Sequence, residues 1–335
     1  MDPKLFEIEK LSVSFNTPEG VLRAVDDVSF DIAAGETVGL VGESGCGKTV
    51  TVLSVLGLLS TTSACIESEK VLFQGRNLHG LDPESLRKIR GSEISIIFQE
   101  PMTSLNPTLT IGRQVAEPLM IHKGFSRAKA YKEAALWLDR VKIPAAKDHM
   151  HDYPYQLSGG MRQRVMIAMA MICNPRLLIA DEPTTALDVT IQAQILSLMI
   201  QLKEEFGMSL LLITHDLGVI AQMAARVIVM YAGQVVETAS IADIFARPFH
   251  PYTQGLLKAR PRLGDFINGL TDKLHEIKGM VPSLTEAFTG CRFADRCPHA
   301  FTKCLEHNPG LVTIQDDQRA RCWLTEFPER RQNHS

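Results

Sequence analysis

One stretch near the N-terminus constrains the fold more than any other. Residues 37–41, TVGLV, have the character of a buried strand and run directly into GESGCGKT at residues 42–49. This octapeptide satisfies G-x-x-x-x-G-K-[ST] in the required setting of strand, loop and helix, which predicts a phosphate-binding loop. Glycines let successive backbone N–H groups turn toward phosphate oxygens, and the following helix adds the positive end of its dipole. The predicted loop consists of Gly42, Glu43, Ser44, Gly45, Cys46, Gly47, Lys48 and Thr49.

Two side chains of this loop have distinct expected roles. Lys48 neutralises charge on the β- and γ-phosphates, and Thr49 offers a hydroxyl to Mg²⁺. A second strand, predicted at residues 177–180, ends in Asp181 and Glu182. Ligands sit at the carboxyl ends of strands in such sheets, so Asp181 is predicted to hold Mg²⁺ through its water shell and Glu182 to polarise an attacking water.

Short β-rich runs alternate with longer helical patterns, which predicts an α/β fold with a parallel or mixed sheet covered by helices. Only helical patterns, at 111–121 and 127–141, appear between residues 101 and 157, and Ser126 is placed to cap the second. A further helix is expected over 190–206, ended by Gly207. The predicted strands are 6–15, 28–32, 37–41, 94–98, 177–180, 210–214, 227–230 and 234–237.

Composition narrows the function classes. Lys and Arg number 35 against 38 Asp and Glu, so no basic excess draws the chain to nucleic acid. The apolar runs are far shorter than the ~20 residues of a membrane-spanning helix, and the N-terminus lacks the pattern of a secretory signal. We therefore expect a cytoplasmic chain that reaches a membrane only through a partner.

Residues 157–164, LSGGMRQR, carry a specific resemblance. The motif LSGGxxQ is the signature of nucleotide-binding subunits of ATP-binding cassette (ABC) transporters, and this chain resembles that family. Ser158 is placed to start a helix running to about Cys173, and Gly159 and Gly160 let its N–H groups approach an anion. The resemblance implies ATP and Mg²⁺ as ligands, and head-to-tail pairing in which each signature helix closes on the ATP held by the partner subunit.

Further residues match this family in the expected order. By resemblance, Gln99 senses Mg²⁺ and the attacking water, His215 contacts the γ-phosphate, and Asp188 lies in the 186–188 loop that crosses the dimer interface. Phe15 takes the place of the aromatic residue that stacks on adenine, although it could equally be a core strand residue. The resemblance thus implies an active ATPase with Lys48, Gln99, Glu182 and His215 as its catalytic residues.

The resemblance also implies an architecture. It predicts a P-loop NTPase core of RecA type with a mixed sheet over residues 1–250, a helical signature subdomain at about 101–157, and a small Cys-rich extension over 251–335. Regular patterns weaken after about Phe249, which supports that boundary.

Three segments resemble the subgroup of oligopeptide, dipeptide and nickel importers: QEPMTSLNP at 99–107, YAGQVVE at 231–237 and HPYT at 250–253. This implies a peripheral subunit at the cytoplasmic face of the inner membrane that powers import of peptides or a related solute. The implied partners are a second, related ATPase subunit in a heterodimer, two membrane permeases contacted by the helical insert and, indirectly, an extracytoplasmic solute-binding protein, with no nucleic acid. The alternatives are a nickel or other-cargo importer, a soluble ABC ATPase acting on DNA or ribosomes, and a regulatory subunit whose main activity lies in its tail.

Four of the seven cysteines lie near the C-terminus, with the spacing C-x5-C-x6-C-x17-C. This is not the C-x2-C pairing of zinc ribbons. The segment that carries these thiols is loop-like and has few apolar residues with which to form a hydrophobic core. This favours a bound ligand that stabilises the segment in place of a core, because metal binding supplies folding free energy. The subgroup resemblance implies a [4Fe–4S] cluster; zinc, with His299 or His307 as further ligands, and free thiols in a docking element are the alternatives. The cysteines concerned are Cys291, Cys297, Cys304 and Cys322.

Overall fold

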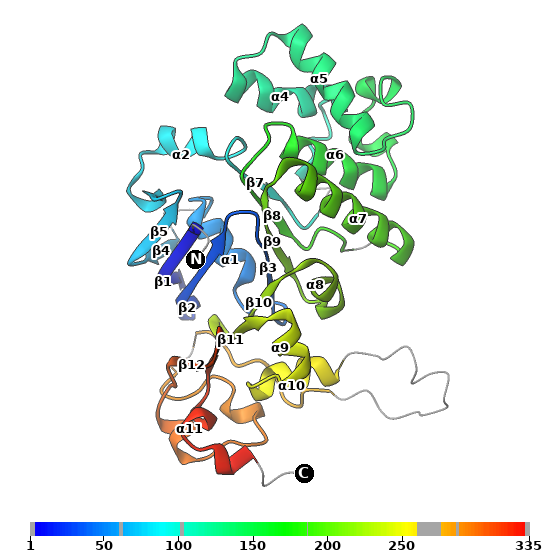
Figure 1. The fold of residues 1–335 in the computed structure, drawn as a ribbon. Helices are drawn as coiled ribbons and strands as arrows, with labels where there is room; N and C mark the ends of the chain where they lie inside the picture. Colours follow the sequence, from blue (N-terminus) through cyan, green and yellow to red (C-terminus); the bar gives the residue numbers. More distant parts are fainter. Residues whose placement is uncertain are drawn as a thin grey trace, which may run out of the picture. The chain divides into compact units, whose positions relative to one another are not determined.

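The computed structural model describes residues 4–59, 63–100, 104–185, 187–259, 276–285 and 288–331 (Figure 1). The chain divides into two compact units, each assembled from separate segments. The first comprises residues 1–6, 32–37 and 72–214, and the second comprises 7–31, 38–71 and 215–335.

Parallel strands form the centre of the first unit, in the order β9-β8-β7. They are β7 (Ile94–Ile97), β8 (Leu177–Asp181) and β9 (Ser209–Thr214). Every residue of β8 and β9 is buried, because helices cover both faces of such a sheet and apolar residues need not alternate with polar ones. All three strands were predicted, with bounds that differ by one residue at an end.

Helices form the outer part of this unit: α4 (Ile111–Lys123), α5 (Arg127–Arg140), α6 (Gly159–Met171) and α7 (Val189–Phe206). Helix α4 packs against both α5 and α6 (Figure 1). Ser126 caps α5 as predicted, since its hydroxyl accepts from the Lys129 N–H, and Gly207 ends α7 in the left-handed conformation. Residues 72–93 of the same unit include a short strand, β6 (Arg76–Asn77), and helix α2 (Pro83–Ile89), neither of which was predicted.

The second unit contains a mixed sheet with the order β12-β13-β11-β10-β3. Strand β3 (Thr37–Val41) is parallel to β10 (Arg226–Tyr231), which forms a hairpin with β11 (Gln234–Ser240). Strands β1 (Lys4–Thr17), β2 (Gly20–Ala33), β4 (Ala64–Glu67) and β5 (Lys70–Phe73) belong to a separate sheet in which β4 pairs antiparallel with β1. The unit's helices are α1 (Lys48–Val55), α8 (Leu217–Met223), α9 (Ile241–Ala246), α10 (Pro251–Lys258) and α11 (Thr302–Glu306).

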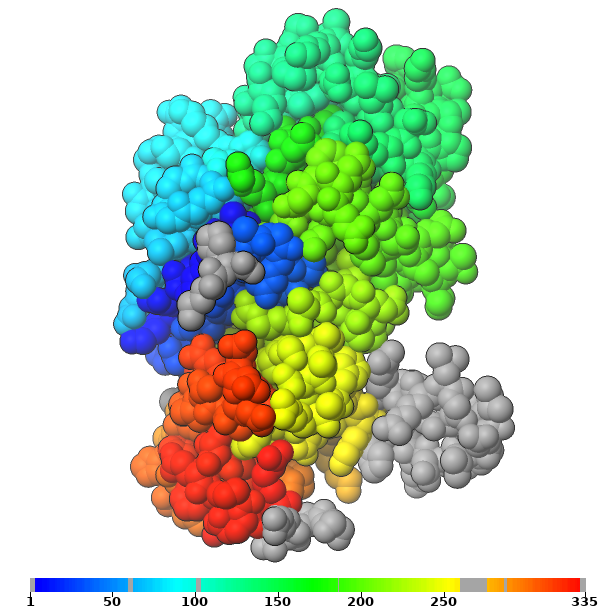
Figure 2. Space-filling view, in the orientation of Figure 1, coloured from blue at the N-terminus to red at the C-terminus, as the bar shows by residue number. Residues whose placement is uncertain are grey.

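The expectation of a loop-like C-terminal segment is wrong. Strands β12 (Leu311–Gln315) and β13 (Gln318–Arg321) continue the sheet of the second unit, and Glu237 of β11 pairs with Ala320 of β13. These strands escaped prediction because β12 is largely exposed and β13 has the polar sequence QRAR. We call the residues after 250 the C-terminal extension or tail. Figure 2 shows its residues 288–331, in orange and red, packed beside the yellow segment that holds α9 and α10.

A buried carboxylate joins the tail to this sheet. Glu237 is fully buried and accepts hydrogen bonds from the backbone N–H groups of Phe249 at 2.7 Å and His250 at 2.8 Å, and from the Gln318 amide at 2.8 Å. A charge is tolerated in the protein interior only when hydrogen bonds replace those of water. Glu237 therefore fixes where the chain enters α10.

Candidate functional site

The predicted phosphate loop connects β3 to α1 in the second unit. All five residues of β3 are buried, and α1 begins at Lys48 with Gly47 as its N-cap. The N-cap Gly47 has no side chain to cap this helix, and the positive end of the helix dipole at the loop suits an anionic ligand. Lys48 is 6% exposed, and its ammonium donates to the carbonyl oxygens of Gly42 at 2.9 Å and Glu43 at 3.0 Å.

Gly47 occupies a position that requires glycine. Its φ is +100°, and a Cβ atom there would lie 2.5 Å from the Ala24 carbonyl oxygen. The carbonyl of the neighbouring residue, Cys46, accepts a hydrogen bond from the Gly233 N–H at 2.9 Å. Gly233 lies in the turn between β10 and β11, so this turn helps to hold the phosphate loop in place. Cys46 itself is buried, and burial raises the pKa of its thiol despite the nearby Lys48 ammonium. Cys46 is therefore a small neutral residue of the loop and no activated thiolate.

Gln99 and Glu182 meet in the first unit. Strands β7 and β8 are parallel neighbours, with Ile97 opposite Ala180, so the residues that follow them emerge at the same edge. The Gln99 Nε2 atom donates to Glu182 Oε2 at 2.9 Å, and the Thr185 hydroxyl donates to the same oxygen at 2.9 Å. The predicted general base is thus oriented by two side chains of its own unit.

Glu182 also has an unusual backbone. Its φ is +47°, in the left-handed region that residues other than glycine seldom adopt, and its N–H donates to the Ile213 carbonyl at 2.8 Å. A strained backbone conformation persists only where the surrounding structure holds the residue in it, and strained residues concentrate at functional sites. The preceding residue, Asp181, is the last residue of β8 and is 2% exposed.

The signature segment begins a helix as predicted. Ser158 is exposed and is the N-cap of α6, its hydroxyl accepting from the Met161 N–H at 3.3 Å. Asp188, also exposed, caps α7 in the same way through the Ile191 N–H at 2.9 Å. The two helix starts are neighbours, since a Cβ atom on Gly160 would lie 2.9 Å from the Ile191 side chain. Ala186, of the predicted 186–188 loop, lies outside the described residues.

The remaining predicted residues occupy the expected elements. Phe15 is half-buried on β1, opposite Ala64 of β4, and His215 is exposed directly after β9. Thr49 lies in the first turn of α1. By unit, Phe15, the phosphate loop and His215 belong to the second, whereas Gln99, Ser158, Gly159, Gly160, Asp181, Glu182 and Asp188 belong to the first.

The four tail cysteines are free thiols that lie near one another. The Cys291 N–H donates to the Cys304 carbonyl at 2.7 Å. Burial raises the pKa of Cys291 to about 11 and that of Cys297 and Cys322 to about 12, and the neighbouring cysteines raise each value further. Among the described residues, no group of three or more His, Cys, Asp or Glu side chains is arranged to hold a metal ion. The iron–sulfur and zinc assignments thus stay predictions.

Sequence reasoning missed two residues that contact the phosphate loop from the tail. Tyr252 and Arg296 both bind Glu43, the second residue of the loop. Tyr252 lies within the HPYT segment at 250–253, which sequence analysis had singled out without giving it a role. Arg296 is one arginine among many in the sequence, and nothing in its neighbours points to the loop.

Comparison with known proteins identifies the family. Residues 25–185 match the ABC transporter family, and residues 236–304 match the C-terminal region of oligopeptide/dipeptide transporters. A probable peptide ABC transporter ATP-binding protein of Sinorhizobium fredii is 51% identical over 95% of this chain and 94% of its own length. The chain belongs to the ABC transporter family. An oligopeptide transport ATP-binding protein of Bacillus subtilis is also 51% identical to this ABC protein, over 96% of the chain and 97% of the relative.

Solved structures agree with this assignment. The dimeric post-hydrolysis state of the ATP-binding cassette MJ0796, bound to ADP and Pi, matches this ABC protein with a TM-score of 0.62 and 29% identity. The match covers 70% of this chain and 98% of that cassette. The predicted α/β P-loop NTPase fold is therefore confirmed. Within the part of the chain that the structure describes, no helix is both long enough and apolar enough to cross a bilayer.

Proposed function

We propose that this chain is the ATP-hydrolysing subunit that powers peptide import through a membrane ABC transporter. The relatives named above are peptide and oligopeptide transport subunits, and the match extends into the C-terminal region specific to such transporters. The observation that carries the hydrolytic part is the Glu182 carboxylate, held by Gln99 and Thr185 at the end of β8.

The chemistry of hydrolysis follows from positioning and charge. Glu182 accepts a proton from the attacking water, His215 contacts the γ-phosphate, and Lys48 neutralises the phosphoryl group as it transfers. Thr49, Gln99 and the nearly buried carboxylate of Asp181 suit Mg²⁺, a cation that prefers oxygen ligands, and would hold it. That ion supplies further neutralisation of the phosphate oxygens.

Two exposed helix starts support the proposed head-to-tail dimer. Ser158 and Asp188 are exposed at the N-termini of α6 and α7, and the adjacent Val189 is 84% exposed. An exposed aliphatic side chain next to the exposed start of α6, where Gly159 and Gly160 let backbone N–H groups approach an anion, suits a surface that closes on a partner and its bound nucleotide. The proposed partners are a related ATPase subunit, two permeases and, indirectly, a solute-binding protein, with this chain at the cytoplasmic face of the membrane.

The Glu182→Gln variant tests the hydrolytic role. In the assembled transporter, ATP turnover should fall by about a hundredfold or more while Mg·ATP still binds, because an amide of the same shape accepts no proton. Glu204→Gln, at an exposed acid of α7, is the matched control and should keep full turnover. Unchanged turnover in Glu182→Gln would place hydrolysis in the other subunit and contradict the proposal.

The cargo is tested in vesicles containing the complete transporter. Labelled dipeptides or oligopeptides should accumulate with ATP, and Ni²⁺ should not. Accumulation of Ni²⁺ alone would replace the peptide assignment with the nickel alternative.

For the tail we propose that Cys291, Cys297, Cys304 and Cys322 bind a [4Fe–4S] cluster. What supports this is that the four thiols lie near one another and that burial raises the pKa of three of them, Cys291, Cys297 and Cys322, an unfavourable setting for thiolates unless a metal compensates their charge. Protein purified without oxygen should contain iron and sulfide and absorb visible light. Zinc without iron would overturn this assignment.

A further inference from the structure

The C-terminal extension binds the side chain of Glu43, the second residue of the phosphate loop. Arg296, at the end of the short helix η4 (Ala294–Arg296), forms a two-pronged ion pair with Glu43: Nη1 lies 2.8 Å from Oε2, and Nη2 lies 3.1 Å from Oε1. The Arg296 side chain is only 6% exposed and that of Glu43 only 26%. Paired geometry and exclusion of water make this stronger than an ordinary surface ion pair.

The tail also holds the backbone of the same residue. The Glu43 N–H donates to the Tyr252 hydroxyl at 2.9 Å. Tyr252 of α10 is fully buried, with ring centroids 4.7 Å from Tyr231 and 5.5 Å from Phe293. Burial raises the pKa of Tyr252 far above its usual value, so the hydroxyl is neutral and accepts this bond at all physiological pH values.

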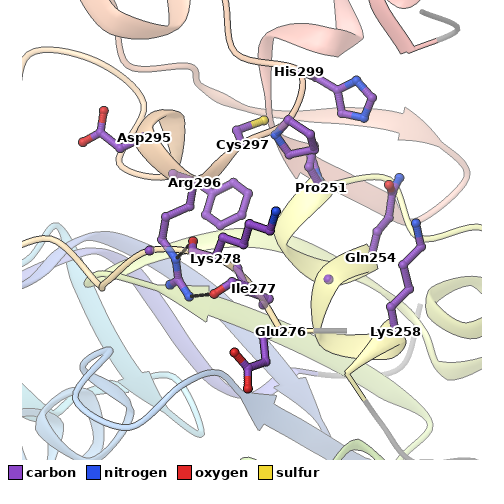
Figure 3. A pocket seen from close by; sticks show the side chains of 14 residues that line it. Pro251, Gln254, Lys258, Glu276, Ile277, Lys278, Asp295, Arg296, Cys297 and His299 are labelled. Atoms are coloured by element: carbon purple, nitrogen blue, oxygen red, sulfur yellow. Dashed lines mark hydrogen bonds between the residues drawn. The ribbon is translucent and has the colours of Figure 1, made fainter. Parts of the chain in front are cut away.

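Arg296 also binds two backbone carbonyls that do not belong to the loop. Its Nε donates to the Lys278 carbonyl at 3.1 Å and its Nη2 to the Ile277 carbonyl at 3.0 Å (Figure 3). Ile277 and Lys278 line a cavity of about 610 Å³, together with Gln254 and Cys297 (Figure 3). The guanidinium thus joins the cavity wall to the phosphate loop.

Two physical consequences follow for the loop. The Glu43 carbonyl is an acceptor for Lys48, so fixing Glu43 also fixes where the phosphate-binding ammonium lies. A carboxylate beside a triphosphate also repels it, and Arg296 neutralises that carboxylate. Both effects favour nucleotide binding, the first because the loop is ordered before the ligand arrives.

We propose that the C-terminal extension positions the phosphate loop: Arg296 and Tyr252 hold Glu43 and thereby set the affinity of this subunit for Mg·ATP. This rests on the proposed function, in which ATP is the ligand of the loop. Arg296 and Tyr252 are positioning residues that act through Glu43 and Lys48. The C-terminal extension therefore contributes to the geometry of the nucleotide site.

The test compares Mg·ATP binding and turnover in the full chain, within its assembled transporter. Arg296→Met should raise the Kd and the KM for Mg·ATP by about tenfold, with kcat at saturating ATP changed less than about twofold. Arg296→Lys keeps the charge but loses the paired geometry, so its Kd should lie between those of the parent and Arg296→Met. Tyr252→Phe removes only the acceptor of the Glu43 N–H and should raise the Kd by a few-fold.

A double-mutant cycle ties the effect to Glu43. With Glu43→Gln present, Arg296→Met should have little further effect on the Kd, because the partner of the arginine is already gone. Arg247→Met is the matched control: Arg247 pairs with Asp243 at 2.8 Å and with no residue of the loop, so Mg·ATP affinity should stay at the parental value.

The possible outcomes separate the positioning role from the proposed function. If the parent binds Mg·ATP and both Arg296→Met and Tyr252→Phe bind it within twofold of the parent, the positioning role is wrong although the proposed function survives. A parent that does not bind Mg·ATP refutes the proposed function itself. If Arg296→Met does not fold, Tyr252→Phe and Arg296→Lys decide by the same criterion, and an equal loss in Arg247→Met also refutes the proposal.

Discussion

Glu182 and the phosphate loop, which belong to different units, are supported in different ways. Glu182 is oriented by Thr185, three positions away in the sequence, and by Gln99, 83 positions away in the same unit. Glu43 of the phosphate loop is held by Tyr252 and Arg296, which lie 209 and 253 positions away. The proposed general base therefore depends on the cassette motifs themselves, whereas the phosphate loop depends on the segment that follows them in the sequence. The tail can thus be altered with little effect on the geometry around Glu182, but not without an effect on the loop.

The largest effect should come from the loop itself. In Gly47→Ala, the alanine has to adopt a φ of +100°, and its Cβ atom would lie 2.5 Å from the Ala24 carbonyl oxygen. The free energy of unfolding should therefore fall by about 3 kcal/mol, and Mg·ATP binding should be lost. Gly45→Ala is the control, because its φ is +78° but nothing lies within 4 Å of its Cβ position; about 1 kcal/mol is expected. Chemical denaturation measures both, and equal losses would show that the Ala24 contact is unimportant.

The next effect concerns the support of Glu182. Gln99→Glu places a second carboxylate at hydrogen-bond distance from Glu182, which raises the pKa of the pair, so turnover at saturating Mg·ATP should fall by about tenfold or more. Thr185→Val removes only a neutral hydrogen bond and should reduce turnover a few-fold. If Thr185→Val weakened Mg·ATP binding as strongly as Arg296→Met, the proposed division between the two supports would fail.

The smallest effect is a pH dependence in the tail. His250 is buried and its pKa is lowered to about 3 by burial, and its Nδ1 accepts from the Tyr252 N–H at 3.1 Å. The unfolded chain takes up a proton below the ordinary pKa of 6.5 while the folded chain does not. The contribution of His250 to stability is therefore complete above pH 6.5 and is lost progressively as the pH falls toward 3.

Between about pH 7 and pH 5.5 the free energy of unfolding should fall by about 1 kcal/mol from this residue. Denaturation curves of the parent and of His250→Gln measure the difference, since the variant lacks the titrating group. Parallel pH profiles for the two proteins would contradict the assignment.

The sequence predicts the centre of each unit well and its periphery poorly. Strands β3, β8 and β9 are continuous apolar runs between loops, so pattern alone locates them. Strand β13 was missed because it contains Arg321, which is buried: its guanidinium binds the Val235 carbonyl at 3.0 Å and Asp27 at 3.0 Å. A pattern that assigns arginine to the surface cannot anticipate a buried one whose partners lie far along the chain.

The same distinction holds for the site. Motif spacing locates the phosphate loop, Ser158 and the acids of β8, because the chemistry requires those residue types in local order. Glu43 occupies a position that the motif leaves open, so no local pattern shows that it is paired. Arg296 and Tyr252 reach it only through the tertiary fold, and only the structure could reveal them.

The Lys48 ammonium is held by acceptors within its own loop. The carbonyl oxygens of Gly42 and Glu43 both accept from it, because a buried charge needs hydrogen bonds in place of those that water would make. A phosphate that binds to Lys48 has to compete with these two carbonyls, so the net gain from the new contact is smaller than for a cation without acceptors.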